Sequence, residues 1–346
     1  MKIGIDARLI EETGVGRYIQ NLIRELGQID KENTYVVFLR KNYQLPNNRW
    51  STRIVDVPWH SISEQLEMPK ILSQEKLDLV HIPYHNPPIF YNGKIVITIH
   101  DLTILHFDTG RATTLPYPIY RLKRLGYYTE LAIGLRRAKK IITVSATTKQ
   151  EIVNHFHIDP EIITVTPEAA DVGISRGKRL VADEYILYVG NAYPHKNLDA
   201  LFDAWPGKIV LATPDDYFSK RLAKRKNVFM FGEASKDELA NLYTYAHALV
   251  FPSLMEGFGL PGIEAMAIGT PVICSDIQVF REMYGNAAVM FNPNDSNDIA
   301  KKIKEVLGNE KLRKDLIAKG KKQASKYSWR KMAEQTLKIY ESSSRL

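Results

Sequence analysis

The chain has 346 residues, of which 45% are hydrophobic and 25% are charged, and its formal net charge is +8. These values exclude a disordered chain, a collagen-like chain and a coiled coil, and the length predicts two domains. The single cysteine excludes an internal disulfide and fits a reducing compartment.

The first half of the chain alternates short runs rich in Val and Ile with segments of helical periodicity. Near-continuous apolar strands are typical of a parallel sheet that is covered on both faces, and helices between such strands form βαβ units. A helix is predicted over 15–26. Strands are predicted over 2–6, 34–39, 77–82, 94–100, 140–145 and 162–167.

A polar segment with two glycines, residues 171–183, interrupts this pattern and is predicted to link two domains. The alternation of strands and helices then restarts, which indicates a second sheet of the same kind. Strands are predicted over 185–190, 208–213, 228–231, 248–252, 271–275 and 287–291, and helices over 197–204, 217–226, 236–246, 261–268, 298–307, 311–326 and 329–341.

This order of elements predicts an α/β protein with two Rossmann-like parallel-sheet domains that face each other across a central cleft. Residues 1–172 are expected to form the first domain and residues 183–326 the second.

The segment with the most chemical information is FPSLMEGFGLPGIEAMAIGTPVICSD, residues 251–276. A predicted strand ends there, a glycine-rich turn follows, and Pro261 stands where a helix is expected to begin. The backbone N–H groups of Phe258, Gly259 and Leu260 would then point toward an anion, in line with the helix dipole. We interpret this turn as a diphosphate site.

Two glutamates flank the same turn. Glu264 is expected about one turn into the helix, where its carboxylate can accept hydrogen bonds from both hydroxyls of a ribose. Glu256 lies in the turn itself and is expected to reach the group beyond the phosphate. The alternative is a loop charge and an exposed helix residue without a function, which the surrounding glycines, proline and strand disfavour.

With these residues the chain resembles the retaining glycosyltransferases of family 4, which have the GT-B fold. The resemblance extends over essentially the whole chain and is strongest in SLMEGFGLPGIEAMAIGTPVICSD. Further matches are YVGNAYPHKNL at 188–198, DAR…GVGRY at 6–18 and TIHD at 98–101. The last helix, within residues 329–346, looks like the one that crosses back to the N-terminal domain in this fold.

The resemblance implies functional residues at the matching positions. Lys196 is the expected donor-phosphate lysine, and the alternative is a solvated surface lysine. Asn191, counted here with the donor-binding residues, stands where the family often has an arginine, and His195 or a nearby basic residue is a candidate replacement for the missing charge. Together with Glu256, Lys196 and His100 are the candidate catalytic residues.

Two features of the first domain fit the same interpretation. His100 closes a predicted strand at the carboxyl end, where α/β sheets bind ligands, and the resemblance implies a place near the donor sugar. The alternative is a histidine at a strand edge whose ring nitrogens are hydrogen bonded within the protein and which has no function. Gly14 and Gly16 precede the first helix, and family members place this loop near the donor phosphate and the acceptor.

No metal site is predicted, because the nine histidines are scattered and no suitable aspartate pair ends a strand. GT-B enzymes stabilise the leaving diphosphate with lysine and helix dipoles, so no cofactor is expected besides the nucleotide-sugar substrate. The P-loop is absent, and the GVG at 14–16 is followed by Arg17, Tyr18 and Ile19 and so does not continue as the GxGxxG fingerprint, which disfavours the remote alternative of a nicotinamide-dependent oxidoreductase. Basic and aromatic residues are not interleaved as in an RNA-binding strand, so no nucleic acid partner is expected.

We therefore expect a retaining, metal-independent hexosyltransferase of polysaccharide biosynthesis. The matches around Asp6 and Lys196 favour a GDP-activated donor, with GDP-mannose preferred, and a UDP-sugar is the alternative. The acceptor is expected to be a glycan or a lipid-linked sugar.

Residues 117–140 contain four tyrosines, several leucines and seven basic residues against one acidic residue. This composition suits contact with an anionic membrane surface, and the alternative is a helix packed on the sheet with solvated charges. No run of about 18 apolar residues occurs, and the N-terminal segment does not resemble a signal peptide. We expect a cytoplasmic protein that is at most peripheral on the inner membrane face.

Overall fold

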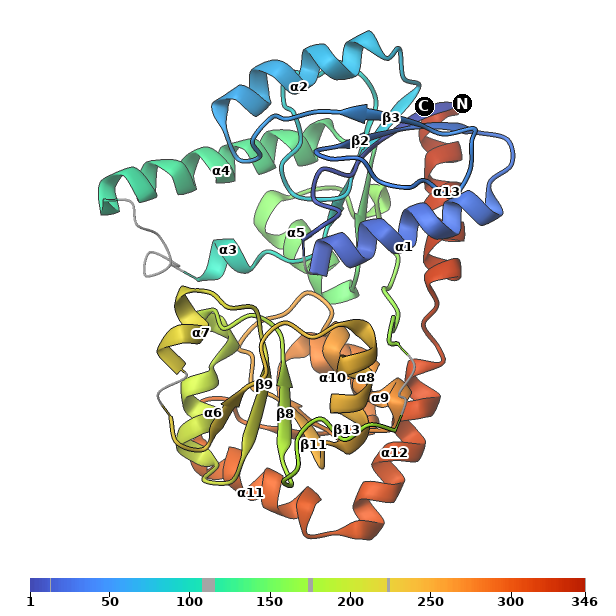
Figure 1. Ribbon diagram of the computed structural model, residues 1–346. Coiled ribbons are helices and arrows are strands. Elements are labelled where there is room, and N and C mark those ends of the chain that lie inside the picture. Colours follow the sequence, from blue (N-terminus) through green and yellow to red (C-terminus); the bar gives the residue numbers. More distant parts are fainter. Residues whose placement is uncertain (13, 108–115, 174–176, 223–224, 346) are drawn as a thin grey trace. The chain divides into compact units, whose positions relative to one another are not determined.

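The computed structural model describes residues 1–12, 14–107, 116–173, 177–222 and 225–345. This part of the chain forms two compact units, each built around one parallel sheet (Figure 1). Most of the first unit comes from residues before 169, and most of the second from residues 169–328. The predicted class, an α/β protein with two parallel sheets, is confirmed.

The sheet of the first unit has seven parallel strands in the order β3-β2-β1-β4-β5-β6-β7. The central strands are buried along their whole length, as expected for strands with helices on both faces. The strand order reverses between β1 and β4, because the chain first builds outward to β3 and then returns to build toward β7. The strands are β1 (Lys2–Asp6), β2 (Thr34–Leu39), β3 (Ser51–Ile54), β4 (Leu79–Ile82), β5 (Ile95–Ile99), β6 (Lys140–Thr143) and β7 (Ile163–Val165).

The last helix of the chain belongs to the first unit, although it follows the second unit in sequence. It packs beside α1, and both termini lie in this unit (Figure 1). The predicted return of the C-terminal helix to the first domain is thus confirmed. The helices of this unit are α1 (Gly14–Ile29), α2 (Ile62–Gln74), α3 (Thr103–His106), α4 (Tyr117–Arg137), α5 (Ala146–Phe156) and α13 (Trp329–Arg345).

A buried chain of polar side chains ties α13 to the sheet. The ring of His81 on β4 contacts the Tyr340 hydroxyl through Nδ1 at 2.6 Å and the Thr98 hydroxyl through Nε2 at 2.7 Å. The Tyr18 hydroxyl lies 3.2 Å from the same Thr98 oxygen. Because all four residues are fully buried, each of these hydrogen bonds replaces one that water would otherwise make.

The second unit has six parallel strands in the order β10-β9-β8-β11-β12-β13. Here the strand order reverses between β8 and β11. The strands are β8 (Ile186–Val189), β9 (Ile209–Ala212), β10 (Val228–Met230), β11 (Ala248–Phe251), β12 (Val272–Ser275) and β13 (Ala288–Phe291). The helices are α6 (Leu198–Ala204), α7 (Tyr217–Leu222), α8 (Lys236–Tyr245), α9 (Leu260–Ile268), α10 (Gln278–Tyr284), α11 (Ser296–Leu307) and α12 (Glu310–Ala324).

Several elements have no counterpart among the sequence predictions, namely β3, α2, α3, α5 and α10. All four residues of the edge strand β3 are exposed, so no apolar alternation marks it in the sequence. The short helix α10 has no side-chain cap at its start. Of the predicted helix 217–226, the described residues form α7 over Tyr217–Leu222, while residues 223 and 224 lie outside the described part, as do residues 174–176 of the predicted linker.

The burial of His81 generates a prediction about acid stability. Burial, with a smaller contribution from the charge of His100, lowers the pKa of His81 to about 3. Below pH ~6.5 the unfolded chain therefore binds a proton at this position that the folded protein does not bind, and this group reduces the free energy of unfolding by about 1.4 kcal/mol per pH unit.

We therefore expect His81→Asn to destabilise the protein by about 2 kcal/mol less at pH 5 than at pH 8, because the variant has no ionisable group to protonate when it unfolds. Urea unfolding of the full chain at both pH values measures the difference. The other titrating groups are present in both proteins, so their contributions cancel when the two free energies of unfolding are subtracted. Equal losses of stability at the two pH values would contradict a neutral, buried His81.

Candidate active site

The candidate site of the second unit lies at the carboxyl end of β8 and β11, the two strands between which the strand order reverses. Parallel α/β sheets bind their ligands at this position, because the loops after the two strands leave in opposite directions. Lys196 ends a short 3-10 turn, Pro194–Lys196, after β8. Glu256 lies in the loop between β11 and α9.

The structure brings Lys196 and Glu256 together. The Lys196 Nζ atom lies 2.6 Å from Glu256 Oε1, and each side chain is 12% exposed. The Ser253 hydroxyl donates to the same Oε1 at 2.8 Å. The backbone N–H of Leu254 donates to the carbonyl of His195 at 2.8 Å and so joins the two loops. The lysine is therefore held in a fixed, mostly water-excluded position and is not a solvated surface residue.

The glycine turn beside this pair starts α9. Gly259 has a φ of +85°, and a Cβ there would collide with the hydroxyl of Tyr284. That hydroxyl donates to the Gly259 carbonyl at 2.5 Å. The helix α9 begins at Leu260, one residue earlier than predicted, and its N-cap residue is Gly259. Because glycine has no side chain, the N-cap residue provides no side-chain acceptor at this positive end of the helix dipole.

Glu264 lies on α9 and has no exposed surface. The Tyr243 hydroxyl on α8 donates to its Oε2 atom at 3.1 Å. Sequence reasoning did not identify Tyr243, because the contact joins two helices 21 residues apart along the chain. A role of Glu264 as a ribose ligand stays a prediction.

Asn191 follows β8 directly after Gly190, which has a φ of +136°. The Tyr188 hydroxyl donates to the Asn191 carbonyl at 2.6 Å and fixes the start of the loop. His195 is buried, at 8% exposure, in the turn that carries Lys196. Whether His195 supplies the charge of the family arginine stays a prediction.

In the first unit, His100 lies at the carboxyl end of β5. Its Nε2 atom is 3.1 Å from the Pro83 carbonyl, which can only accept, so Nε2 carries a hydrogen. Its Nδ1 atom is 3.2 Å from a carboxylate oxygen of Glu168, and the ring edge contacts the ring of Tyr18 at 4.8 Å. The imidazole is thus held in one orientation. Glu168 was not predicted, although its place just after the last strand of the first sheet is a signal for it.

The two glycines before α1 differ in what the structure requires of them. A Cβ on Gly16 would lie 2.6 Å from the carbonyl oxygen of Ile10, so only glycine lets α1 approach the preceding loop. A Cβ on Gly14 would meet open space. The predicted contacts of both glycines with phosphate or acceptor stay predictions.

A buried ion cluster occupies the point of strand reversal in the first sheet. The Arg8 guanidinium binds Asp6 at 2.7 Å and Glu64 at 2.5 Å, and all three residues are less than 10% exposed. Burial raises the pKa of Glu64, and the charge of Arg8 opposes this rise. A small hollow beside the cluster is lined by Trp59 and Tyr84 among others. The DAR motif supplies Asp6 and Arg8 of this cluster, whereas Glu64 comes from α2, which is distant in sequence.

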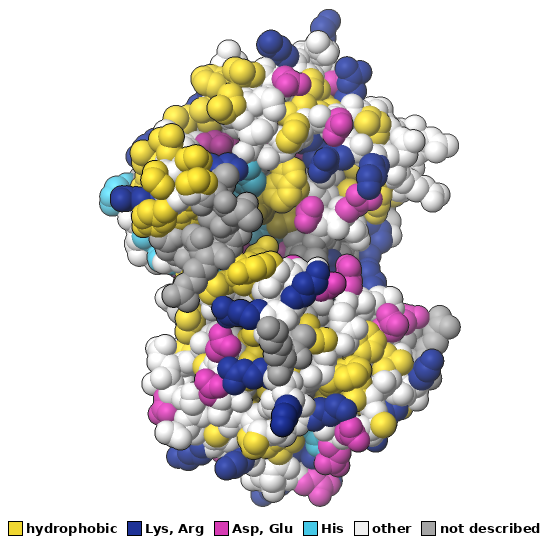
Figure 2. Space-filling view, turned by 60° about the vertical axis from the view of Figure 1, so that its left-hand side comes forward, with side chains coloured by type: hydrophobic (Ala, Val, Ile, Leu, Met, Phe, Trp, Pro, Cys, Tyr) yellow, Lys and Arg dark blue, Asp and Glu magenta, His cyan; other side chains and the backbone are white. Residues whose placement is uncertain are grey.

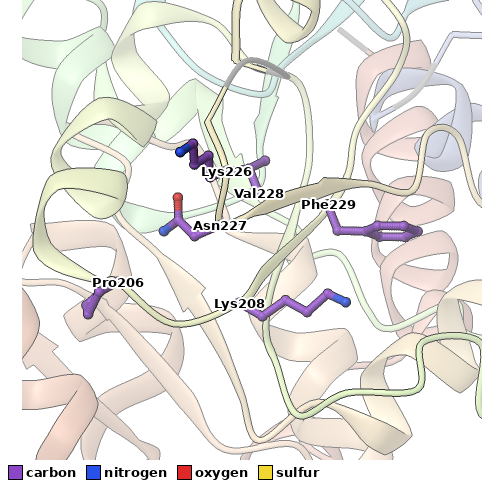
Figure 3. A pocket seen from close by; sticks show the side chains of 6 residues that line it. All are labelled: Pro206, Lys208, Lys226, Asn227, Val228 and Phe229. Atoms are coloured by element: carbon purple, nitrogen blue, oxygen red, sulfur yellow. The ribbon is translucent and has the colours of Figure 1, made fainter.

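One hollow of the second unit is not part of the candidate site. It is lined by residues at the amino ends of β9 and β10, the end of the sheet opposite to Lys196 (Figure 3). The Lys208 ammonium there is paired with Asp183 at 2.6 Å, and the Asn227 amide donates to the Trp205 carbonyl at 2.8 Å. Its main polar groups already have protein partners.

Two features are absent from the described residues. No group of three or more His, Cys, Asp and Glu side chains within them is placed to hold a metal ion. None of the described helices combines the length and the apolar composition that crossing a bilayer requires.

Comparisons with known proteins place these features in context. A family model described as Glycosyltransferase Family 4 matches residues 13–173, and one described as Glycosyl transferases group 1 matches residues 175–323. The chain is 31% identical over 272 residues to the O-antigen chain mannosyltransferase RfbU of Salmonella typhimurium, covering 75% of this chain and 73% of that protein.

Two further comparisons agree. The chain is 28% identical over 289 residues to the O-antigen chain mannosyltransferase B of Escherichia coli, covering 74% of this chain and 73% of that protein. Among solved structures, the sucrose-phosphate synthase of Thermosynechococcus elongatus matches with a TM-score of 0.80 at 18% identity, covering 99% of this chain and 98% of that chain. This last likeness concerns the fold alone.

The geometry of the glycine turn predicts the effect of a single methyl group. We expect Gly259→Ala to destabilise the protein by at least about 1–2 kcal/mol, because the left-handed backbone disfavours a side chain and Tyr284 blocks its space. Gly126→Ala is the matched control. Gly126 lies inside α4 with open space around it, so the control should gain about 0.5–1 kcal/mol. Urea unfolding measures both, and equal stabilities would refute the strained turn.

Proposed function

Because this chain belongs to the family 4 glycosyltransferases, we propose that it transfers a mannose-type hexose from a nucleotide sugar, with GDP as the preferred nucleotide, to a glycan or lipid-linked acceptor in polysaccharide biosynthesis. The predicted GT-B class and glycosyltransferase activity are confirmed, and they replace the alternative of an oxidoreductase. The mannose-type sugar is supported by two relatives that are O-antigen chain mannosyltransferases.

The observation that carries the proposal is the Lys196–Glu256 pair beside the uncapped start of α9. When the bond from the sugar C1 to the diphosphate oxygen breaks, negative charge develops on the departing diphosphate. The ammonium of Lys196 and the N–H groups at the start of α9 would stabilise this charge without a bound metal, because both are fixed before the reaction begins.

Glu256 has two tasks in this proposal. Its Oε1 atom holds Lys196 and accepts the Ser253 hydroxyl, which fixes the position of the ammonium. Its Oε2 atom has no hydrogen bond or ion pair within the described residues and would be available to hydroxyls of the donor sugar. Glu256 would thus position both the phosphate ligand and the sugar.

His100 is the candidate catalytic residue of the first unit. Its orientation is set by Pro83 and Glu168, which engage both ring nitrogens, and we propose that the ring lies near the donor sugar and does not act as a general base. The reaction is proposed to retain the anomeric configuration, so the acceptor hydroxyl would form its bond to C1 on the face that the diphosphate leaves.

Lys196→Ala is expected to lower kcat about 10²–10³-fold, because a fixed positive charge near the leaving group is lost. Lys208→Ala is the matched control. It also removes an ion-paired lysine of the second unit, but at the opposite end of the sheet, and should leave kcat unchanged. Steady-state rates with folded variants, checked by circular dichroism, test this. Similar rates for both variants would contradict the assignment of Lys196 to the active site.

The preferred donor is tested by the melting temperature in the presence of nucleoside diphosphates. Ligands that bind the folded state raise the melting temperature by mass action, so GDP should raise it more than UDP, ADP or TDP at equal concentration. A larger effect of UDP would favour the alternative UDP-sugar donor. With the donor so identified and EDTA present, transfer should continue, and proton NMR of the fresh product should show the donor's anomeric configuration.

A further inference from the structure

The N-terminal half of α4 exposes apolar side chains on all sides. Tyr117, Ile119, Leu122 and Leu125 are between 52% and 70% exposed. The helix becomes buried only from Tyr127 onward, where Leu131 and Leu135 enter the core. In Figure 1 this half of α4 extends beyond the rest of its unit. Large apolar groups clustered on a surface mark an interaction site more often than scattered ones do.

Neighbouring segments add to this surface. Ile62 and Leu66 on α2 are 82% and 55% exposed, and Phe90 is 60% exposed. These segments adjoin α4, because the Gln65 amide donates to Glu130 Oε1 at 3.0 Å and accepts the backbone N–H of Ile89 at 2.8 Å. Figure 2 shows apolar side chains gathered on the upper unit with basic ones among them.

The charges on α4 are almost all positive. Arg121, Lys123 and Arg136 are exposed and form no ion pair within the described residues. The acidic Glu130 is engaged by Gln65, and burial raises its pKa to about 7, so its carboxyl group is only partly ionised at neutral pH. Arg124 is different, because its guanidinium donates to the Leu105 carbonyl at 2.7 Å and supports the local fold.

We propose that the surface formed by Tyr117–Leu125, Ile62, Leu66 and Phe90 binds an anionic lipid bilayer. The leucine and isoleucine side chains enter the headgroup region, Tyr117 lies at the interface, and Arg121 and Lys123 contact the anionic headgroups. The charge pattern favours this occupant over a second copy of the chain, because two such basic surfaces would repel each other. The inference does not depend on which nucleotide sugar the protein uses.

Sedimentation of the full chain with vesicles tests the proposal. We expect binding to vesicles that contain about 30% phosphatidylglycerol in phosphatidylcholine, little binding to pure phosphatidylcholine, and weaker binding in 0.5 M NaCl because salt screens the headgroup charge. Nucleotide-induced stabilisation of the same samples is measured in parallel, so a failure of the membrane surface is distinguished from a failure of the proposed activity.

Two double variants identify the surface. Arg121→Gln with Lys123→Gln should weaken partitioning about 25-fold, at roughly fivefold per charge. Leu122→Gln with Leu125→Gln should also abolish stable binding while leaving the charge unchanged. The control is Lys301→Gln with Lys304→Gln, which removes the same charge from exposed positions on α11 and should change binding less than twofold.

Three outcomes would overturn the proposal. One is the absence of binding to anionic vesicles at low salt. Another is binding that the α4 variants leave intact and the α11 control reduces. The third is a concentration-dependent dimer that Leu122→Gln with Leu125→Gln disrupts, which would assign the surface to a second copy.

Discussion

Parallel strands impose one constraint from which the functional candidates of this protein follow. Each crossover returns the chain to the amino end of the sheet, so the loops that follow the strands all collect at the carboxyl edge. Where the strand order reverses, neighbouring loops diverge and polar side chains can meet between them. Asp6 and Arg8 occupy this position in the first sheet, and Lys196 and Glu256 occupy it in the second.

The two charge clusters differ in what their electrostatics allow. Arg8 lies between two carboxylates and is 6% exposed, so its charge is used within the protein and supports the loops around it. Lys196 shares a single carboxylate and lies beside the uncapped start of α9. The charges of Lys196 and Glu256 cancel each other, and the start of α9 adds the partial positive charge of the helix dipole. The second cluster is therefore suited to binding an anion.

Buried polar contacts also explain why the last helix is part of the first unit. Tyr340 on α13 completes the hydrogen bonding of His81, whose ring would otherwise be buried without a partner on one side. The apolar face of α13 packs beside α1 in the same unit. The integrity of the first sheet therefore depends on a segment that is synthesised after the whole second unit.

The sequence by itself determined the two α/β units, nearly all buried strands and the glycine turn before α9, because these features depend on local periodicity and on backbone freedom at single residues. It also placed Lys196 and Glu256 at strand ends, through their positions after apolar runs and their family resemblance. Only the tertiary structure decided that their charged atoms lie 2.6 Å apart, that Tyr243 holds Glu264, and that Glu64 joins Arg8. These contacts join residues 21 to 60 positions apart along the chain, and no local pattern encodes such a distance. The exposed edge strand β3 escaped prediction for a related reason, since its place is set by pairing with β2 and not by burial of its own side chains.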